Sequence, residues 1–159
     1  MRRAAGAGVF ALTLAVSLGA VVAALVSQHA FDMQPCPWCV LQRLIFVALA
    51  LVALLGLLWS SRPGRRVAAS LGVLLAALGA AAALWQHVVA AKSVSCNLTL
   101  ADRIVSGLQL DAWLPQVFAA TASCADAAVQ LFGVPYEYWS LGLFGALGIA
   151  LVTALMHRR

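Results

Sequence analysis

Charged residues are scarce in this sequence, and acidic residues are the scarcest of them. Only 9% of the 159 residues are Asp, Glu, Lys or Arg, with five acids against ten bases, while 64% are hydrophobic. Soluble globular proteins carry roughly a quarter charged residues and roughly half apolar ones. The composition therefore excludes an ordinary water-soluble domain.

The apolar residues lie in long blocks, and this arrangement predicts transmembrane helices. About 20 apolar residues cross a bilayer as a helix, and hydrocarbon offers no partner for unpaired backbone N–H and C=O groups. Four blocks approach or exceed this length, at 8–27, 44–60, 67–85 and 139–156. We therefore expect an all-α membrane protein in which residues 1–159 form a single four-helix transmembrane bundle.

The first block also has features of a secretory signal, because Arg2 and Arg3 precede an apolar run. That run continues to Val26, beyond the roughly 7–15 residues of a signal core, and Gln28-His29-Ala30 is a poor cleavage site. We expect the first helix to be retained.

The few charges are distributed unevenly, which predicts the orientation. Basic residues without acidic neighbours lie at both termini and between the second and third blocks: Arg2, Arg3, Arg62, Arg65, Arg66, Arg158 and Arg159. Since excess Lys and Arg marks the cytoplasmic side, we expect both termini and residues 61–66 inside, and the loops 28–40 and 86–138 outside. The net charge of +5 then reflects topology, and the sequence shows no nucleic-acid-binding pattern.

All four cysteines, Cys36, Cys39, Cys96 and Cys124, lie in the two outward loops. In an oxidising compartment they can pair, and four cysteines allow three connectivities. The close spacing of Cys36 and Cys39 favours a local pair, which leaves Cys96 with Cys124. We expect the second pair to be an exposed disulfide available to a soluble protein; the alternative is a staple that only restricts the loop.

Cys36-Pro37-Trp38-Cys39 is the sharpest chemical signal in the chain. Two cysteines at this spacing close a small ring, and the dipole at a helix N-terminus favours a thiolate, so the motif suits a disulfide that opens and closes. The alternatives are a permanent bridge and half of a zinc site. Zinc is disfavoured because Cys96 and Cys124 form no second Cys-x-x-Cys, and we expect no metal. The absence of a strand-helix-strand pattern excludes a thioredoxin fold.

Two basic side chains are candidates for the same site. Arg43 follows Cys39 by four residues, so a helix places guanidinium and sulfur on one face. Its cation would stabilise a Cys39 thiolate and polarise the oxygen of a bound electron acceptor; otherwise it snorkels to water. His87, at the outer end of the third block, either delivers a proton to a reduced acceptor or anchors the helix at the interface.

One segment of the long loop is amphipathic. Its apolar residues share one helical face, but Pro115 interrupts the pattern: Leu110, Trp113, Leu114, Val117 and Phe118. We expect a short or broken helix that lies on the membrane surface or folds onto the top of the bundle.

With these residues in place, the chain resembles the DsbB family of bacterial inner-membrane disulfide-forming proteins. The resemblance runs from the first helix to the fourth. It is carried by Cys36-Pro37-Trp38-Cys39 with Gln42-Arg43, by residues 110–118, by Cys124-Ala125, and by Phe132-Gly133 through Trp139.

The resemblance implies an enzyme, a quinone-dependent protein-dithiol oxidoreductase that reoxidises a periplasmic thioredoxin-like partner, DsbA. It implies that Cys36 and Cys39 are the redox pair at the membrane, with Cys39 and Arg43 beside ubiquinone or menaquinone and His87 a further candidate there. Cys96 and Cys124 match the loop pair that oxidises DsbA, with Cys96 taking the mixed disulfide. The expected location is the bacterial inner membrane, with the redox loops facing the periplasm.

Two rival functions have recognisable signatures. The vitamin K epoxide reductase family is also a four-helix bundle, but its loop cysteines precede the Cys-x-x-Cys, whereas here they follow it. A non-catalytic membrane protein with two structural disulfides would fail to reoxidise a reduced thioredoxin-like protein when quinone is added.

Overall fold

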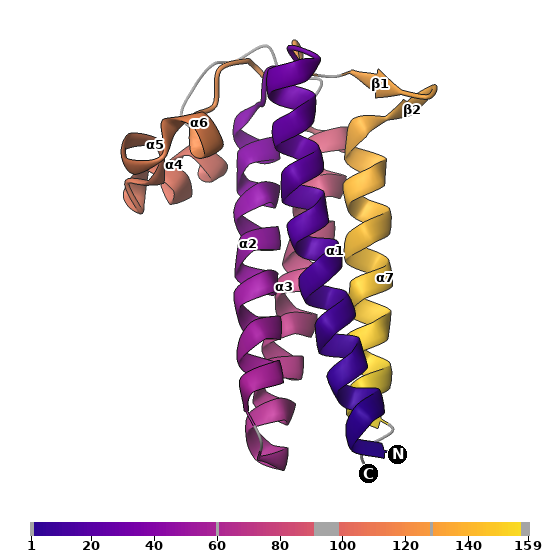
Figure 1. Ribbon diagram of the computed structural model, residues 1–159. Coiled ribbons are helices and arrows are strands. Elements are labelled where there is room, and N and C mark those ends of the chain that lie inside the picture. The colour runs from indigo at the N-terminus through magenta and orange to yellow at the C-terminus, as the bar shows by residue number, and fades with distance from the viewer. Residues whose placement is uncertain (1, 60, 91–98, 128, 157–159) are drawn as a thin grey trace.

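The computed structural model describes residues 2–59, 61–90, 99–127 and 129–156, so Cys96, Arg158 and Arg159 lie outside the described residues. Its long helices form one bundle (Figure 1): α1 (Arg2–Ala30), α2 (Pro37–Leu58), α3 (Arg62–Val88) and α7 (Tyr136–Met156). Four helices in the described part of the chain are long and apolar enough to cross a membrane. The prediction of a four-helix membrane protein is confirmed. Helix α1 begins and α7 ends at the same end of the bundle (Figure 1).

Helix α2 begins at Pro37, ahead of the expected residue 44. Hydropathy marks only the apolar part of a helix, whereas the actual start is set by a cap. The Cys36 side chain accepts a hydrogen bond from the Cys39 N–H, and Pro37 occupies the first turn, where its missing N–H costs nothing. As a result, Cys39 and Arg43 both lie inside the first turns of α2, at the end opposite the chain termini.

Close packing between α3 and α7 fixes the centre of the bundle. A methyl group added at Gly72 would lie 2.8 Å from the Leu151 side chain, and one at Gly79 would collide with the Phe144 ring. Phe144 in turn stacks on Phe46 of α2 with ring centroids 4.1 Å apart. Because lipid supplies no hydrophobic drive between helices, this interlocking of glycine and large side chains is what holds the bundle together.

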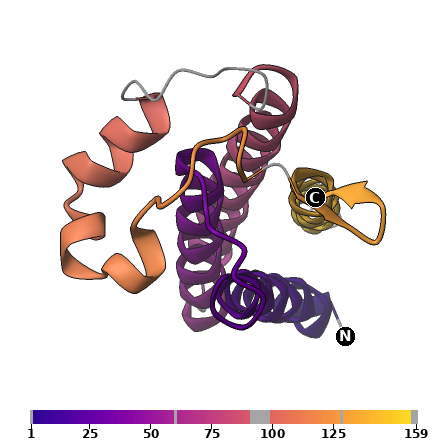
Figure 2. The same cartoon turned by 90° about the horizontal axis from the view of Figure 1, so that it is seen from above.

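The long segment between α3 and α7 folds back beside α2. It contains α4 (Leu100–Gly107), α5 (Leu110–Trp113) and α6 (Pro115–Phe118), and the view from above shows these helices outside the bundle on one side (Figure 2). The expected broken helix is confirmed, since α5 ends before Leu114 and α6 restarts at Pro115. Phe118 packs with Val40 and Val105, so α6 lies against α2.

A small hairpin precedes α7. Strand β1 (Gln130–Leu131) pairs antiparallel with β2 (Val134–Pro135), with Leu131 opposite Val134. The two residues of the turn, Phe132 and Gly133, both have positive φ, at 56° and 78°. Two-residue hairpins of this kind need positive φ at both central positions. The hairpin delivers the chain directly into the first turn of α7.

Candidate functional site

The two cysteines of the Cys-x-x-Cys motif lie at the end of α2 opposite the chain termini. Their sulfur atoms are 2.7 Å apart, and the Cys39 backbone N–H donates to the Cys36 sulfur over 3.3 Å. Cys36 is fully buried, with 0% of its surface exposed. The first turn of the helix thus holds both sulfurs in the arrangement that a local disulfide needs, with Cys39 under the positive end of the helix dipole.

Cys124 lies against the same pair, which spacing alone did not predict. Backbone N–H groups of Thr121 and Ala122 both donate to the Pro35 carbonyl, over 3.0 and 3.3 Å. These bonds hold the residues before Cys124 beside the residues before Cys36. Cys36 and Cys124 belong to one buried cluster with Trp38 and Ala101.

Cys124 is not exposed, so the expectation that it belongs to an exposed disulfide is wrong as to its exposure. Only 9% of its surface is exposed. The reason is that α4 and residues 119–127 pack over the ends of α2 and α3 opposite the chain termini instead of extending into water. Cys96, its expected partner, lies outside the described residues.

The contact between Cys36 and Cys124 changes the acidity of both thiols. Hydrogen bonding with the Cys124 and Cys39 side chains, together with burial, raises the pKa of the Cys36 thiol well above its ordinary range. The hydrogen bond from Cys36 lowers the pKa of Cys124, against the opposing effect of burial, and a backbone N–H at Trp38 acts in the same direction. Cys36 is therefore the proton-bearing member of this contact and Cys124 is the better nucleophile.

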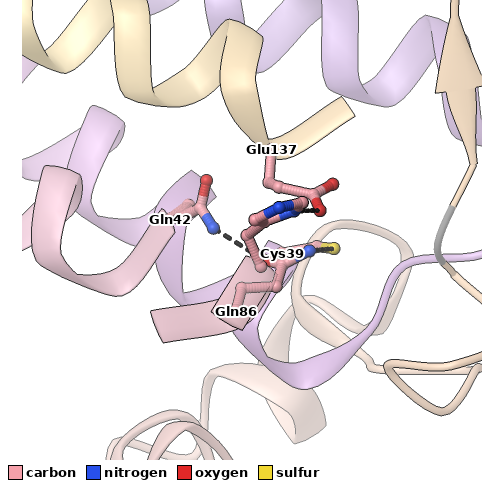
Figure 3. A network of polar contacts seen from close by, with 5 residues as sticks. Cys39, Gln42, Gln86 and Glu137 are labelled. Atoms are coloured by element: carbon pink, nitrogen blue, oxygen red, sulfur yellow. Dashed lines mark hydrogen bonds and ion pairs between the residues drawn. The ribbon is translucent and has the colours of Figure 1, made fainter. Parts of the chain in front are cut away.

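A pair of buried glutamines supports Cys39 from the other side. Gln42 Nε2 donates to Gln86 Oε1 over 2.7 Å, and Gln86 Nε2 donates to the Cys39 sulfur over 3.3 Å. Figure 3 shows Cys39, Gln42 and Gln86 side by side where α2 faces α3. Since Gln42 occupies the carbonyl of Gln86, the amide of Gln86 is oriented with its N–H toward sulfur. A donor held in this way stabilises negative charge on Cys39.

Arg43 lies one turn after Cys39 on α2 and is 5% exposed. Its Nη1 donates to Gln28 Oε1 of α1 over 2.9 Å and also to the Val117 carbonyl of α6. Its Nε has no hydrogen-bond partner among the described residues. Arg43 therefore ties α1 and α6 to α2, while one N–H of its guanidinium is buried without a partner among the described residues.

His87 and Glu137 form the remaining polar contact of the site. His87 Nδ1 and Glu137 Oε1 are 2.8 Å apart, which joins the end of α3 to the start of α7. The His87 ring also packs on Tyr138, with centroids 4.6 Å apart. Sequence analysis did not single out Glu137. Its burial, at 5% exposed, could not be read from its position beside a helix end.

A cavity of about 210 Å³ lies between α1, α2, α3 and α7, at the end of the bundle opposite the chain termini. Its polar wall contains Cys39, Gln42, Arg43, Gln86 and Glu137, and the remaining wall is mostly apolar. Pockets that bind whole drug-sized ligands have volumes of about 300–1,000 Å³. The cavity therefore admits a compact ring with one or two polar oxygens, and a longer apolar chain attached to that ring would extend beyond it.

A second cavity, of about 1190 Å³, lies on the other side of the sulfur atoms, between α2, α3 and α4. Cys124 and Trp38 border it, but neither Cys39 nor Arg43 does. Although it is larger, it lacks the guanidinium and the glutamine donors of the smaller cavity. The smaller cavity is therefore the candidate site for an electron acceptor.

Comparison with known proteins places the chain among disulfide-forming proteins. The family model described as Disulfide bond formation protein DsbB matches residues 6–154. The chain is 34% identical over 151 residues to Disulfide bond formation protein B of Ralstonia nicotianae, covering 94% of this chain and 93% of that protein. It is 31% identical to the protein of the same name from Burkholderia thailandensis, over 91% of this chain and 86% of that protein. It is 30% identical to the protein of that name from Stutzerimonas stutzeri, over 96% of this chain and 94% of that protein.

Proposed function

This chain belongs to the DsbB family of disulfide bond formation proteins, and on that premise we propose that it moves electrons from a periplasmic DsbA-like protein to membrane quinone. Family membership makes it a disulfide-forming membrane oxidoreductase. The proposal adds the route: from reduced DsbA to Cys96–Cys124, then to Cys36–Cys39, then to ubiquinone or menaquinone. The observation that carries the proposal is the placement of Cys36 between Cys124 and Cys39, with Cys39 on the wall of the cavity.

The exchange between the two cysteine pairs follows from this placement. Reduction of the loop pair by DsbA leaves a thiolate at Cys124, whose lowered pKa favours that form. The thiolate attacks the Cys36 sulfur of the Cys36–Cys39 disulfide, an S–S bond forms between Cys124 and Cys36, and Cys39 leaves as a thiolate. Attack by the Cys96 thiolate on Cys124 then restores the loop disulfide and leaves Cys36 and Cys39 reduced.

Cys39 is suited to be the leaving group. It lies near the N-terminus of α2, where the helix dipole favours a negative charge, and Gln86 donates to its sulfur. A leaving thiol with a stabilised thiolate departs faster in thiol exchange. The same thiolate lines the cavity, so it is held where the acceptor would bind.

The residues of the cavity fit a quinone head group. Arg43 Nε is a buried donor with no partner in the described part of the chain, and a quinone carbonyl oxygen is a matching acceptor. The apolar remainder of the wall suits the ring. When bound, a quinone supplies the capacity to accept two electrons and two protons, the same numbers that a dithiol releases on forming a disulfide.

The need for a quinone has an energetic reason. The DsbA disulfide is a strong oxidant with a potential of about −120 mV, so regenerating it needs an acceptor stronger than thiols in water. Each 30 mV corresponds to about 1.4 kcal/mol for a two-electron transfer. A membrane quinone satisfies this need, and its solubility in lipid explains why the enzyme is a membrane protein.

The direction of the chain in the membrane is part of the proposal. Arginines outnumber acids at the end of the bundle where α1 begins, and this end is expected to face the cytoplasm. The cysteines of the site lie at the opposite end, toward the periplasm of a bacterial inner membrane.

A turnover assay tests the proposal. Purified protein is mixed with reduced DsbA and either a water-dispersible ubiquinone or a menaquinone analogue, and quinone loss is followed by absorbance. We expect catalytic oxidation of DsbA with one quinone consumed per disulfide formed, and no turnover by Cys39→Ser. If the folded protein leaves DsbA reduced with both quinones, it is a non-catalytic membrane module and the proposal fails.

A further inference from the structure

Glu137 is a buried carboxyl group on the wall of the cavity. It lies in the first turn of α7, is 5% exposed, and lines the cavity together with Cys39 and Arg43. Figure 3 draws Glu137 in the same view of polar contacts as Cys39, Gln42 and Gln86. Ionisable groups are rarely buried unless they are paired or used, because removing a charge from water is costly. The distribution of charged residues between the two sides of the membrane does not explain why this carboxyl group is buried.

The contact between Glu137 and His87 extends from the cavity wall toward the protein surface. His87 Nδ1 contacts Glu137 Oε1 at 2.8 Å, and the side chains of His87 and Glu137 are 35% and 6% exposed. The ring of Tyr138 packs on His87 and keeps it over α7. Two groups that can each bind and release a proton thus form a continuous hydrogen-bonded path from the outer surface to the cavity.

The proposed reaction requires such a path. The Cys36 thiol and the Cys39 thiolate together lose two electrons and one proton when their S–S bond forms. The quinone takes up those two electrons and needs two protons, so the second proton must enter from outside the dithiol. Cys39 leaves its disulfide as a thiolate and brings no proton, because the second proton of the DsbA dithiol is released during the earlier exchange steps, and the cavity wall is mostly apolar.

We propose that Glu137 and His87 form a proton relay that carries this second proton from the outer surface into the quinone cavity. Glu137 gives a proton to the reduced oxygen and recovers one from His87, which is recharged from water. The inference rests on the proposed function because it needs a quinone as acceptor. It assigns Glu137, which no sequence pattern singled out, a direct part in the chemistry.

The groups around Glu137 are compatible with this role. In the described part of the chain, the other titratable groups on the cavity wall are Cys39 and Arg43 from α2 and Tyr136 from α7. The competing explanation is purely structural, with His87 and Glu137 serving only to tie α3 to α7.

Glu137→Gln separates the two explanations, because glutamine keeps a hydrogen bond to His87 but cannot carry a proton. We expect kcat at saturating quinone to fall roughly 10²-fold, the typical contribution of a general acid. The loss should grow with pH, since protons must then come directly from water, and formate should restore part of the rate as a small diffusible acid. Glu137→Asp should keep the wild-type pH dependence with a smaller loss, and His87→Gln should reproduce the Glu137→Gln profile.

Two measurements without turnover complete the test. The quinone dissociation constant of the oxidised protein, measured by calorimetry with ubiquinone-1, should stay within about threefold of wild type in Glu137→Gln. Single-turnover oxidation of DsbA by quinone-free protein should be unchanged. Asp111→Asn and His29→Gln serve as matched controls because both residues lie away from the cavity, and neither should alter the pH profile.

The outcomes are distinguishable. If wild-type protein reduces no quinone, the proposed function itself fails and the relay with it. If wild type is active and Glu137→Gln keeps its kcat and pH profile, the relay is wrong and the contact is structural. A Glu137→Gln variant that loses quinone binding or single-turnover exchange to the same extent as kcat also overturns the relay.

Discussion

Arg43→Met is the substitution that tests the site most deeply, because Arg43 has two tasks in this structure. Its Nη1 donates to Gln28 and to the Val117 carbonyl, and its Nε is a buried donor without a partner among the described residues, which we propose binds the quinone oxygen. Methionine fills similar space but removes every donor. The substitution should therefore weaken quinone use and loosen the α6 segment that precedes Cys124.

The hydrogen bonds that the substitution removes set the magnitude of the loss in quinone use and of the loss in stability. A hydrogen bond from a charged donor contributes roughly 1.5–3 kcal/mol. Losing the one contact to the quinone oxygen should lower kcat/KM for quinone about ten- to hundredfold. Losing the contacts to Gln28 and Val117 should cost a similar free energy of unfolding, nearer the low end, because water can replace part of what the half-buried Val117 loses.

Three assays separate these effects. Steady-state kinetics report quinone use, a single turnover of DsbA without added quinone reports exchange between the cysteine pairs, and hydrogen exchange of residues 110–118 reports the anchoring of α6. We expect the largest loss in the first assay, a smaller loss in the second, and faster exchange in the third. Arg43→Lys should recover only part of each, since an ammonium cannot reproduce the planar fork.

Two further variants control for charge and for anchoring. Arg103→Met removes an exposed arginine of α4 and should change none of the three readouts. Gln28→Ala removes one anchor of Arg43 but leaves Nε intact, so it should affect hydrogen exchange more than quinone kinetics. Unchanged quinone kinetics in Arg43→Met would refute the reasoning and leave Arg43 with an anchoring role only.

Three further predictions concern topology and the cysteines. A cysteine introduced by Ser61→Cys should resist an impermeant thiol reagent in intact cells, because the arginines around it predict a cytoplasmic position; labelling there would overturn the orientation. Cys124→Ser should accumulate a covalent complex between Cys96 and reduced DsbA, visible on a non-reducing gel, because the thiol that displaces the mixed disulfide is missing. If folded Cys124→Ser protein forms no such complex, the assignment of the loop pair is wrong. In reduced protein, the alkylation rate of Cys124 should rise with pH at a midpoint below that of an ordinary thiol, and Cys36→Ala should move this midpoint upward, because the Cys36 hydrogen bond lowers the pKa of Cys124. Mass spectrometry of iodoacetamide adducts measures the midpoint in both proteins. Equal midpoints in wild type and Cys36→Ala would exclude the contact.

The helical bundle was predictable because one physical constraint dominates it. Long apolar blocks in lipid must be helices, so hydropathy alone located all four. The first turns of α2 and α3 were less visible, since they contain Pro37 or Arg62 and are set by the caps Cys36 and Ser61. A hydropathy window does not detect hydrogen bonds to single backbone N–H groups.

The candidate site was predictable only where its residues are neighbours along one helix. Helical spacing placed Cys39 and Arg43 together, and both line the cavity. The contact between Gln42 and Gln86 joins residues 44 positions apart, and no pattern in a single sequence indicates such a pairing. Glu137 was overlooked for a related reason: its burial depends on the packing of α3 against α7.

The approach of Cys124 to Cys36 was missed because spacing can favour only local pairs. It depends on two backbone hydrogen bonds to the Pro35 carbonyl, which are formed by Thr121 and Ala122. Backbone groups carry no side-chain signature, so their partners are invisible in a sequence. The same bonds explain why Cys124 is buried rather than presented on a free loop.

The depth at which Cys36 lies has a consequence for cellular selectivity. No part of its surface is exposed, and Cys124 is nearly covered as well. Small soluble thiols and peroxides react with sulfur atoms that they can reach, so the sulfur atoms of Cys36 and Cys124 are shielded from them. Under the proposed function, reducing equivalents then enter through a protein that first engages the loop, and free thiols in the surroundings do not pass their electrons to the quinone pool.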